Sequence, residues 1–240
     1  MKKQLSVLLV FVLALSACGF ALPGTVTGSG KMVTQTFNVR DFDQIRLGTS
    51  GVMYIEQGDD FSLTVEADDN ILPILKVEVE QGVLTIRTSP EVSALQFETI
   101  IYRLTLPALR AIDLSGSADI RVEDFTADSL NININGSGDV TFVNLEADAL
   151  SVRISGSGWM DMAGETQALT VTVSGSGDLL AERLKASDVE VAVNGSGDAT
   201  VWAVDRLDVS ISGSGNVKYR GSPKLTEKIS GGGDLSRLSD

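Results

Sequence analysis

Histidine is absent from this chain of 240 residues, and cysteine occurs once, as Cys18. Without histidine the chain cannot build a Ser-His-Asp or Cys-His catalytic group, a histidine-ligated zinc site or a two-histidine, one-carboxylate iron site. A single cysteine cannot form a disulfide within the chain. Several common classes of enzyme and metal site are therefore excluded before any motif is considered.

Positive charge is scarce as well, because 19 Lys and Arg stand against 32 Asp and Glu, a formal net charge of −13. Such a surface repels nucleic acid, so we expect no DNA or RNA partner. No Gly-rich loop ends in Gly-Lys-Ser/Thr, and the Gly-Ser-Gly runs are mostly followed by Asp, which has the wrong sign for binding phosphate. The sequence thus indicates neither a catalytic constellation nor a cofactor, and we expect no enzyme.

The N-terminus has the order of a lipoprotein signal. Lys2 and Lys3 precede an apolar stretch, 5–15, which is too short to span a bilayer as a mature helix. It runs into Leu15-Ser16-Ala17-Cys18, which resembles a bacterial lipobox. We predict a signal peptide over 1–17 and lipidation of Cys18. The alternative is an ordinary secretory signal with a chance cysteine.

The residues after the lipobox set the expected location. The segment 18–35 is rich in Gly, Ser, Thr and Pro, and we interpret it as a flexible tether between the lipid and the folded part. Gly19 follows the cysteine, and by analogy lipoproteins that lack Asp there reach the outer membrane. We therefore expect a membrane contact through the lipid and a place in the cell envelope, at the outer membrane or the cell surface.

Seven glycine-containing turns recur through the second half of the chain, and their first glycines are separated by 20, 20, 19, 20, 18 and 18 residues. They are Gly116-Ser117-Ala118, Gly136-Ser137-Gly138, Gly156-Ser157-Gly158, Gly175-Ser176-Gly177, Gly195-Ser196-Gly197, Gly213-Ser214-Gly215 and Gly231-Gly232-Gly233. A period near 20, held over six intervals, is typical of a stacked repeat rather than of a globule with one central core.

One repeat unit shows how such a rung is built. Leu130, Ile132 and Ile134 alternate with Asn, a period of two that indicates a strand with one buried face. The turn 136–138 follows, where we expect glycine because it accepts positive φ. The same apolar positions recur in every repeat, so like residues stack on like. The pattern predicts an all-β fold: a parallel β-solenoid with rungs of about 20 residues.

The first half is β-rich without this regularity. Over 36–107 we expect short strands, with hairpin turns at 57–60 and 81–82. The stretch 48–51, Gly-Thr-Ser-Gly, is interpreted as a degenerate early copy of the repeat turn. The sequence predicts one continuous body rather than two independent domains.

The last 20 residues, 221–240, are predicted to form a C-terminal cap. Glu227 stands in a column that the preceding rungs fill with Val or Ile. A charge at this position is expected to oppose the edge-to-edge growth that an open β-edge invites.

Several motifs resemble a known family. They are Arg40-Asp-Phe-Asp-Gln-Ile45, Val65-Glu-Ala-Asp-Asp-Asn-Ile-Leu72, Val77-Glu-Val-Glu-Gln-Gly-Val-Leu-Thr-Ile86, Leu104-Thr-Leu-Pro-Ala-Leu109, Ile112-Asp-Leu-Ser-Gly-Ser117 and the Ser-Gly-Ser-Gly-Asp turns. In this order they resemble the bacterial auto-transporter adhesin, head GIN domain family, over residues 36–220. The resemblance implies a right-handed β-helix on an envelope lipoprotein. The resemblance implies no catalytic residue for this chain.

The acids that follow the turns form a column of candidate site residues. Its members are Asp119, Asp139, Asp178, Asp198 and Asp234, with Asn216 in register and Trp159 as the exception. One interpretation is a line of carboxylates that binds cations such as Ca²⁺. The other, which we favour, is turn chemistry, since Asp side chains hydrogen-bond nearby backbone N–H groups.

Trp159 replaces the acid in one turn and is the candidate contact for a glycan. An exposed Trp can stack on sugar rings, and it can equally cover the corner of a rung. The sequence leaves both interpretations open.

Three functions are compatible with these features. The leading one is a lipid-anchored, non-enzymatic module of the cell envelope, adhesin-like or a scaffold, that binds a surface glycan or protein and can form homo-oligomers. The first alternative is a polysaccharide lyase or hydrolase, because β-helices host such enzymes and two carboxylates suffice for glycoside hydrolysis. The second alternative is an envelope sensor or assembly partner.

Overall fold

The computed structural model describes residues 24–96 and 99–239, and within them the protein is almost entirely β-structure. The strands are β1 (Thr25–Thr27), β2 (Met32–Phe37), β3 (Gln44–Gly48), β4 (Val52–Gln57), β5 (Ser62–Asp68), β6 (Leu75–Glu80), β7 (Val83–Thr88), β8 (Ala94–Gln96), β9 (Ile101–Leu106), β10 (Ala111–Leu114), β11 (Asp119–Ile134), β12 (Val140–Ile154), β13 (Met160–Val173), β14 (Leu179–Val193), β15 (Ala199–Ile211), β16 (Val217–Arg220), β17 (Lys224–Ile229) and β18 (Leu235–Arg237), with one 3-10 helix, η1 (Leu72–Ile74). The predicted signal peptide and Cys18 lie outside the described residues.

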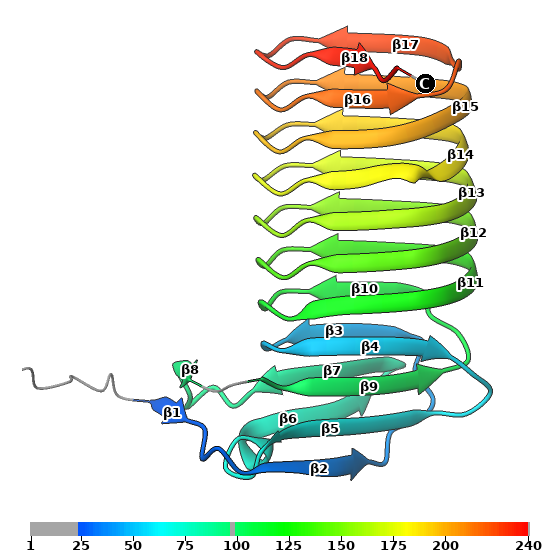
Figure 1. Ribbon diagram of the computed structural model, residues 1–240. Helices are drawn as coiled ribbons and strands as arrows, with labels where there is room; N and C mark the ends of the chain where they lie inside the picture. Colours follow the sequence, from blue (N-terminus) through cyan, green and yellow to red (C-terminus); the bar gives the residue numbers. More distant parts are fainter. Residues whose placement is uncertain (1–23, 97–98, 240) are drawn as a thin grey trace, which may run out of the picture.

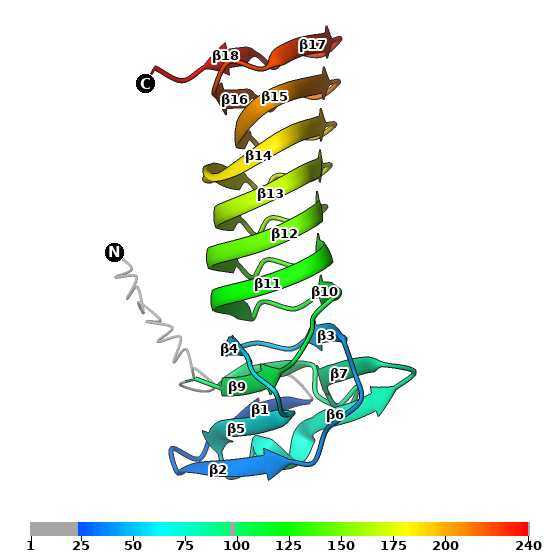
Figure 2. The ribbon, with the colours of Figure 1, turned by 90° about the vertical axis from the view of Figure 1, so that its right-hand side faces the viewer.

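From β10 to β18 the chain is the predicted parallel solenoid (Figure 1). The strand segments before each glycine turn make a first sheet, which contains β3, β10 and β17. The segments after each turn make a second sheet, which contains β4, β16 and β18. In β11 to β15 one long strand bends from the second sheet into the first, and this bend is called the third side. On the near face of Figure 2 the ribbons rise from left to right toward the C-terminus, so the coil is right-handed.

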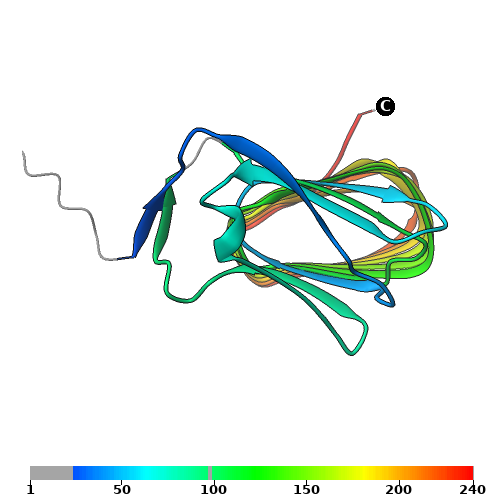
Figure 3. The same cartoon turned by 90° about the horizontal axis from the view of Figure 1, so that it is seen from below.

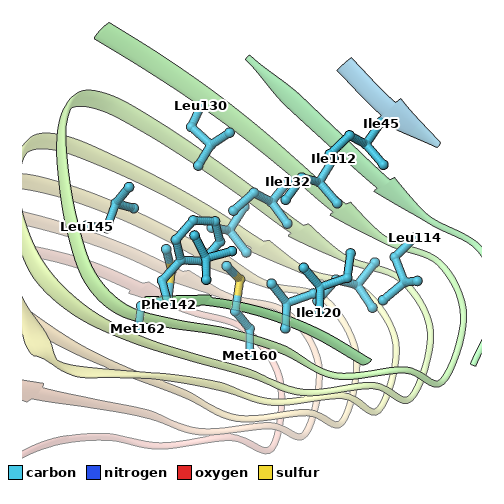
Figure 4. Close-up of a cluster of buried hydrophobic side chains, with 14 of the residues drawn as sticks. Ile45, Ile112, Leu114, Ile120, Leu130, Ile132, Phe142, Leu145, Met160 and Met162 are labelled. Carbon is cyan, nitrogen blue, oxygen red and sulfur yellow. The ribbon is translucent and has the colours of Figure 1, made fainter. Parts of the chain in front are cut away.

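The stacking is in register, as the repeat predicts. Leu130 pairs with Leu150, Ile132 with Val152 and Ile134 with Ile154, so each inward side chain lies on its equivalent in the next rung. Figure 4 shows Leu130 and Ile132, with Phe142 on the facing sheet, pointing into the space between the two sheets. On the second sheet Phe142 pairs with Met162 in the same way, and both side chains are fully buried. The core is therefore a continuous apolar column, and neighbouring rungs supply the burial that one rung lacks.

The glycines of the turns are required by close packing. None of them has φ in the left-handed region, so the expectation of positive φ is wrong for these turns. A Cβ on Gly136 would instead overlap the carbonyl oxygen of Gly116, and a Cβ on Gly138 would overlap that of Ala118. Ala118 is tolerated in the lowest regular turn, beneath which lies the irregular turn 48–51. Glycine at both positions is thus the condition for stacking one turn on another.

Differences in repeat length are absorbed at the third side. The ladder between β12 and β13 shifts between Phe142 and Leu145, and the ladder between β14 and β15 shifts twice between Ala181 and Asp188. The ladder between β13 and β14 shifts between Asp161 and Ala163, where the second sheet passes into the third side, and the ladders of the first sheet keep their register. Intervals of 18, 19 or 20 residues therefore leave the turns and sheets aligned.

The first rungs are stacked out of sequence order. β3 and β4, joined by the turn 48–51, form a rung beneath β10 and the start of β11. The backbone N–H of Ser115 donates to the carbonyl of Leu47 at 3.0 Å, as in the regular turns, so the early copy is confirmed. β7 and β9, which come later in the chain, lie beneath β3 and β4. Each sheet thus stacks nine parallel strands, which makes a column about 38 Å tall.

The placement of β7 and β9 beneath β3 and β4 determines which of the two predicted hairpins forms. Gln81 and Gly82, with φ of 51° and 80°, join β6 to β7 as an antiparallel hairpin, as predicted. The turn at 57–60 does not form one, because β9 lies between β4 and β5 and pairs with both. The prediction of a hairpin at 57–60 is therefore wrong: β5 pairs with β9, and not with β4, which directly precedes it in the sequence.

Gln57 takes the place of the third side that the β3–β4 rung lacks. Its Nε2 donates to the carbonyl oxygens of Pro107 at 3.1 Å and Thr126 at 3.0 Å, and its Oε1 accepts from the Thr126 N–H at 2.8 Å. One side-chain amide therefore connects the rung below to the rung above where the main chain departs.

The two ends of the column differ. At the lower end β2 pairs antiparallel with β5, and in Figure 3 the blue strand crosses the lower end of the coil diagonally. The segment 24–35, expected to be tether, contains β1, paired with β8, and most of β2, so the folded part begins earlier than expected. These added strands close the lower end.

At the upper end the predicted cap, 221–240, contains a further rung. β17 and β18 continue the parallel ladders, and Glu227 pairs with Val209 of the inward column. Leu225 is 38% and Ile229 is 42% exposed. No described residue lies above this rung, so its edge is unpaired (Figure 1).

Candidate functional site: the outer face of the second sheet

The acid column runs along the start of the second sheet, just after the turns, and its members below the last rung, Trp159 excepted, each bond to the rung above. Asp119 accepts from the Asp139 N–H at 3.1 Å, Asp139 from the Trp159 N–H at 3.0 Å, Asp178 from the Asp198 N–H at 2.7 Å, and Asp198 from the Asn216 N–H at 2.7 Å. Asn216 does the same for the Asp234 N–H at 3.0 Å. The side chains thus supply acceptors for backbone groups that the turns leave without a carbonyl partner.

These hydrogen bonds account for the acids by turn chemistry. Among residues 24–96 and 99–239 no three acidic side chains are gathered as a metal-binding group. The carboxylates of Asp119, Asp139, Asp178 and Asp198 each accept from the backbone one rung above, so the acids form a line rather than a cage. Cation binding by the five acids stays a prediction.

Trp159 interrupts this line. Its N–H is satisfied by Asp139, but its indole offers no acceptor, and the backbone N–H of Asp178 makes no corresponding bond within the described chain. The Trp159 side chain is 37% exposed. In the next rung Leu180, whose strand partner is Asp161, is 45% exposed on the same face. The chain therefore replaces a repeated hydrogen bond with an exposed aromatic next to an exposed aliphatic side chain.

A second aromatic on this face was missed by the sequence reasoning. Tyr54 of β4 is 41% exposed, and its strand partners are Arg103 on β9 below and Arg121 on β11 above. Beside it is a hollow of about 420 Å³ lined by Tyr54, Glu56, Ser62, Thr64, Arg103 and Thr105, together with Ile101 and Leu104. The available signal was the outward position of an aromatic in the alternating strand 52–57.

A separate hollow of about 460 Å³ follows the third side. Asp148 accepts from the Gln167 Nε2 at 3.0 Å, and Glu165 lies 3.7 Å from the Lys185 Nζ. Asp128 and Glu146 also line this groove. These carboxylates are the group nearest to what the alternative of a polysaccharide-active enzyme requires.

On the outer face of the first sheet one ion pair stands out. The hydrogen bond from the Arg206 guanidinium to Asp208 raises the pKa of Arg206 and lowers the pKa of Asp208. Arg206 is exposed and Asp208 is half-buried, and no hollow with an aromatic accompanies them among the described residues. We assign this pair a structural role.

The lipid-attachment prediction cannot be placed on the structure, because Cys18 lies outside the described residues. In the described parts of the chain, no helix has the length and apolar character needed to cross a membrane.

Comparison with known structures identifies relatives of the same shape. The chain is similar to a “putative adhesin” from Bacteroides fragilis NCTC 9343, with 28% identity and a TM-score of 0.86 over 89% of this chain and 100% of that chain. A “putative adhesin” from Parabacteroides distasonis ATCC 8503 shares 26% identity at a TM-score of 0.70, covering 89% and 100%. A “putative lipid binding protein” from the same organism, 23% identical with a TM-score of 0.75 over 90% and 100%, shows the shared fold alone.

No curated protein matches the chain. Residues 41–223 match the family described as “Putative auto-transporter adhesin, head GIN domain”, close to the 36–220 of the resemblance. This match spans most of the chain and agrees with the right-handed solenoid and its order of motifs. The chain belongs to the auto-transporter adhesin, head GIN domain family.

Proposed function

We propose that this protein is a lipid-anchored, non-enzymatic binding module of the cell envelope that holds a surface glycan on the outer face of its second sheet. The observation that carries the proposal is Trp159. At that turn the chain gives up the acceptor that every neighbouring rung provides and exposes an indole instead. The same hydrogen bond recurs along the rest of the column, so its replacement by an exposed indole at one rung suggests selection for something other than stability.

The chemistry of this face suits a glycan. An indole and the neighbouring Leu180 offer an apolar platform for the C–H face of a sugar ring. The flanking carboxylates of Asp139 and Asp178 are acceptors for hydroxyl groups. A formal charge of −13 opposes a polyanionic ligand, which favours an uncharged one.

The proposed anchor sets the orientation. Lipidation at Cys18 would place the attachment six residues before Gly24, where the described chain begins near the closed lower end (Figure 1). The column would then extend away from the membrane at the outer membrane or cell surface, with its open rung outermost. Acyl chains hold a protein at a bilayer because each methylene buried in it contributes about 0.8 kcal/mol to binding.

The anchor is tested by expressing the full chain with Cys18→Ser in a Gram-negative host. The native chain is expected to partition into the detergent phase and to carry a mass increment of the lipid, and the variant is expected to lose both. Equal partitioning of the two proteins would remove the anchor from the proposal.

The glycan site is tested on the purified full chain with a panel of neutral and acidic oligosaccharides. Trp159→Ala is expected to weaken binding of the preferred glycan about tenfold, the loss of one aromatic contact. Trp159→Asn removes the ring and restores the acceptor, and loss of binding by this variant, with its fold checked by thermal melting, is attributed to the ring. Val204→Ala, an exposed apolar position on another side of the column, is the matched control and should bind normally.

The enzyme alternative has its own test in the same panel. The acids of the third-side groove make it a specific rival, and turnover of any polysaccharide that disappears in Glu165→Gln or Asp148→Asn would overturn the non-enzymatic proposal. Binding without turnover would support it.

A further inference from the structure

The geometry points to a second sugar-ring subsite at Tyr54, so that a neutral oligosaccharide lies along the solenoid axis between Tyr54 and Trp159. This inference rests on the proposed glycan-binding function and extends it to a site assembled from three strands. It concerns the hollow beside β4, β9 and β5, which lie one below another on the near face of Figure 1.

The strand order builds this hollow. Register places Thr64 of β5 against Arg103 of β9, and Arg103 against Tyr54 of β4. These three residues alternate with buried neighbours, so their side chains share the outer face. β5 runs antiparallel to β9 and departs from the parallel coil, and the hollow of about 420 Å³ lies where this change of direction occurs. Its volume falls within the range of small-molecule sites.

The lining residues match the surface of a pyranose. Tyr54 is 41% exposed, and its ring offers an apolar face for the axial C–H groups of a sugar. Arg103 donates hydrogen bonds and Glu56 accepts them, while the hydroxyls of Ser62 and Thr64 do both. Polar groups of both kinds around one aromatic face are the arrangement that a ring with alternating C–H and O–H groups requires.

The charges favour a neutral sugar over an acidic one. The hollow contains one cation, Arg103, and one anion, Glu56. Arg103 also lies 3.5 Å from Glu66, a carboxylate that competes with any acidic group of a ligand. An uncharged ligand uses the donors and the acceptors without disturbing this balance.

The distance to Trp159 decides the size of the ligand. β4, β11, β12 and β13 are consecutive strands of the second sheet, and Trp159 directly precedes β13. Three strand spacings separate the two aromatics by about 14 Å along the axis. One sugar ring cannot contact both, whereas an oligosaccharide running across the strands can. Affinity is therefore expected to rise with chain length until both aromatics are covered.

The test is isothermal titration of the purified full chain with a series of neutral oligosaccharides of increasing length, taken from the glycan that binds best. Tyr54→Ala is expected to weaken binding of the longer members about tenfold or more, and Tyr54→Phe is expected to bind within about threefold of the native chain, because the ring is kept. Val204→Ala is the control for an exposed apolar truncation, and thermal melting confirms that each variant is folded.

Each outcome has a distinct meaning. Loss of binding in both Tyr54→Ala and Trp159→Ala, with the length dependence abolished in either variant, supports the two-point site. Binding that needs Trp159 but survives Tyr54→Ala overturns this inference and leaves the proposed function intact. Preference for acidic oligosaccharides that depends on Arg103 overturns the neutral class. Absence of binding by every saccharide overturns the proposed function and this inference together.

Discussion

At the scale of single residues, the acid column shows which side chains can accept the hydrogen bond from the rung above, and Trp159 is its one exception among Asp119 to Asn216. Asn216 demonstrates that a neutral amide serves the column as well as a carboxylate, because its Oδ1 accepts from the Asp234 N–H and its Nδ2 donates to Asp198 at 3.1 Å. Trp159 alone among the column residues from Asp119 to Asn216 has no such oxygen. The effect of the missing acceptor on the free energy of unfolding can be measured by replacing Trp159 with a residue that restores the oxygen.

Trp159→Asn is expected to raise the free energy of unfolding by about 0.5–1.5 kcal/mol, the net value of one satisfied hydrogen bond. The measurement is urea denaturation of the native chain and the variant. Asp139→Ala, which removes the acceptor for the Trp159 N–H, is expected to lower stability by a similar amount. A destabilised Trp159→Asn would mean that indole packing outweighs the missing acceptor.

Tyr102 gives the fold a sensitivity to alkaline pH. Burial raises the pKa of its phenol, which donates to Ser50 O at 3.3 Å. Because the pKa is higher in the folded state than in the unfolded state, stability is fully present below the unfolded value of about 10 and is lost as the pH rises above it. Urea denaturation at pH 8 and pH 11 should show this loss in the native chain and a smaller one in Tyr102→Phe. Equal losses would assign the alkaline sensitivity to other groups.

At the scale of elements, turns and strands tolerate opposite kinds of change. The third side accommodates intervals of 18 to 20 residues, whereas the outer glycines of the turns lie against the carbonyl groups of the turn below. A side chain added there has to push two rungs apart.

Gly177→Ala is expected to lower the free energy of unfolding by about 1–3 kcal/mol, the usual range for overpacking, because its Cβ would overlap the carbonyl of Gly158. Gly232→Ala is the matched control in the last turn, where the nearest atom, Ser214 Oγ, lies 3.9 Å from the added Cβ. Thermal unfolding of both variants distinguishes them. Equal stabilities would contradict the packing explanation of the turns.

Gln57→Ala is expected to lower stability by about 1–3 kcal/mol, since the backbone groups at Pro107 and Thr126 lose their partner. Gln57→Glu should also destabilise, because a carboxylate accepts from the Thr126 N–H but cannot donate to either carbonyl. Gln35→Ala, at an exposed position of β2, is the control. If Gln57→Glu matched the native chain in urea denaturation, the donor half of the bridge would be without effect.

At the scale of the whole molecule, the column is closed at one end and open at the other. Antiparallel strands cover the lower end, while the β17–β18 rung leaves its upper edge unpaired with Leu225 and Ile229 exposed. Unpaired β-edges invite association, and Glu227 places a charge in the inward column at that edge.

Glu227→Val is expected to make the protein associate end to end, seen in sedimentation velocity as an apparent mass that increases with concentration. Thr226→Val, whose strand partner Asp208 lies on the outer face, is the matched control and should stay as the native chain. Unchanged sedimentation of Glu227→Val would show that the charge is not what limits growth.

Prediction from the sequence succeeded where neighbours in space are also successive repeats. The alternation at Leu130, Ile132 and Ile134 and the regular turns were enough to predict the solenoid, its register and the position of the acid column. It failed where distant segments meet. Nothing local in 57–60 indicates that β9 inserts between β4 and β5, and the hollow at Tyr54 depends on that insertion. The role of the turn glycines was also missed, since it arises from the rung below.

By itself the sequence determined the period, the two faces of each strand and the stacking of like side chains, because these follow from a repeat whose contacts are made with the next copy. Only the tertiary structure decided the order of the first rungs, the bridging by Gln57 and which exposed aromatics share one surface. These depend on contacts between segments up to 69 residues apart, such as Gln57 with Thr126, and no local pattern carries information about contacts at that separation.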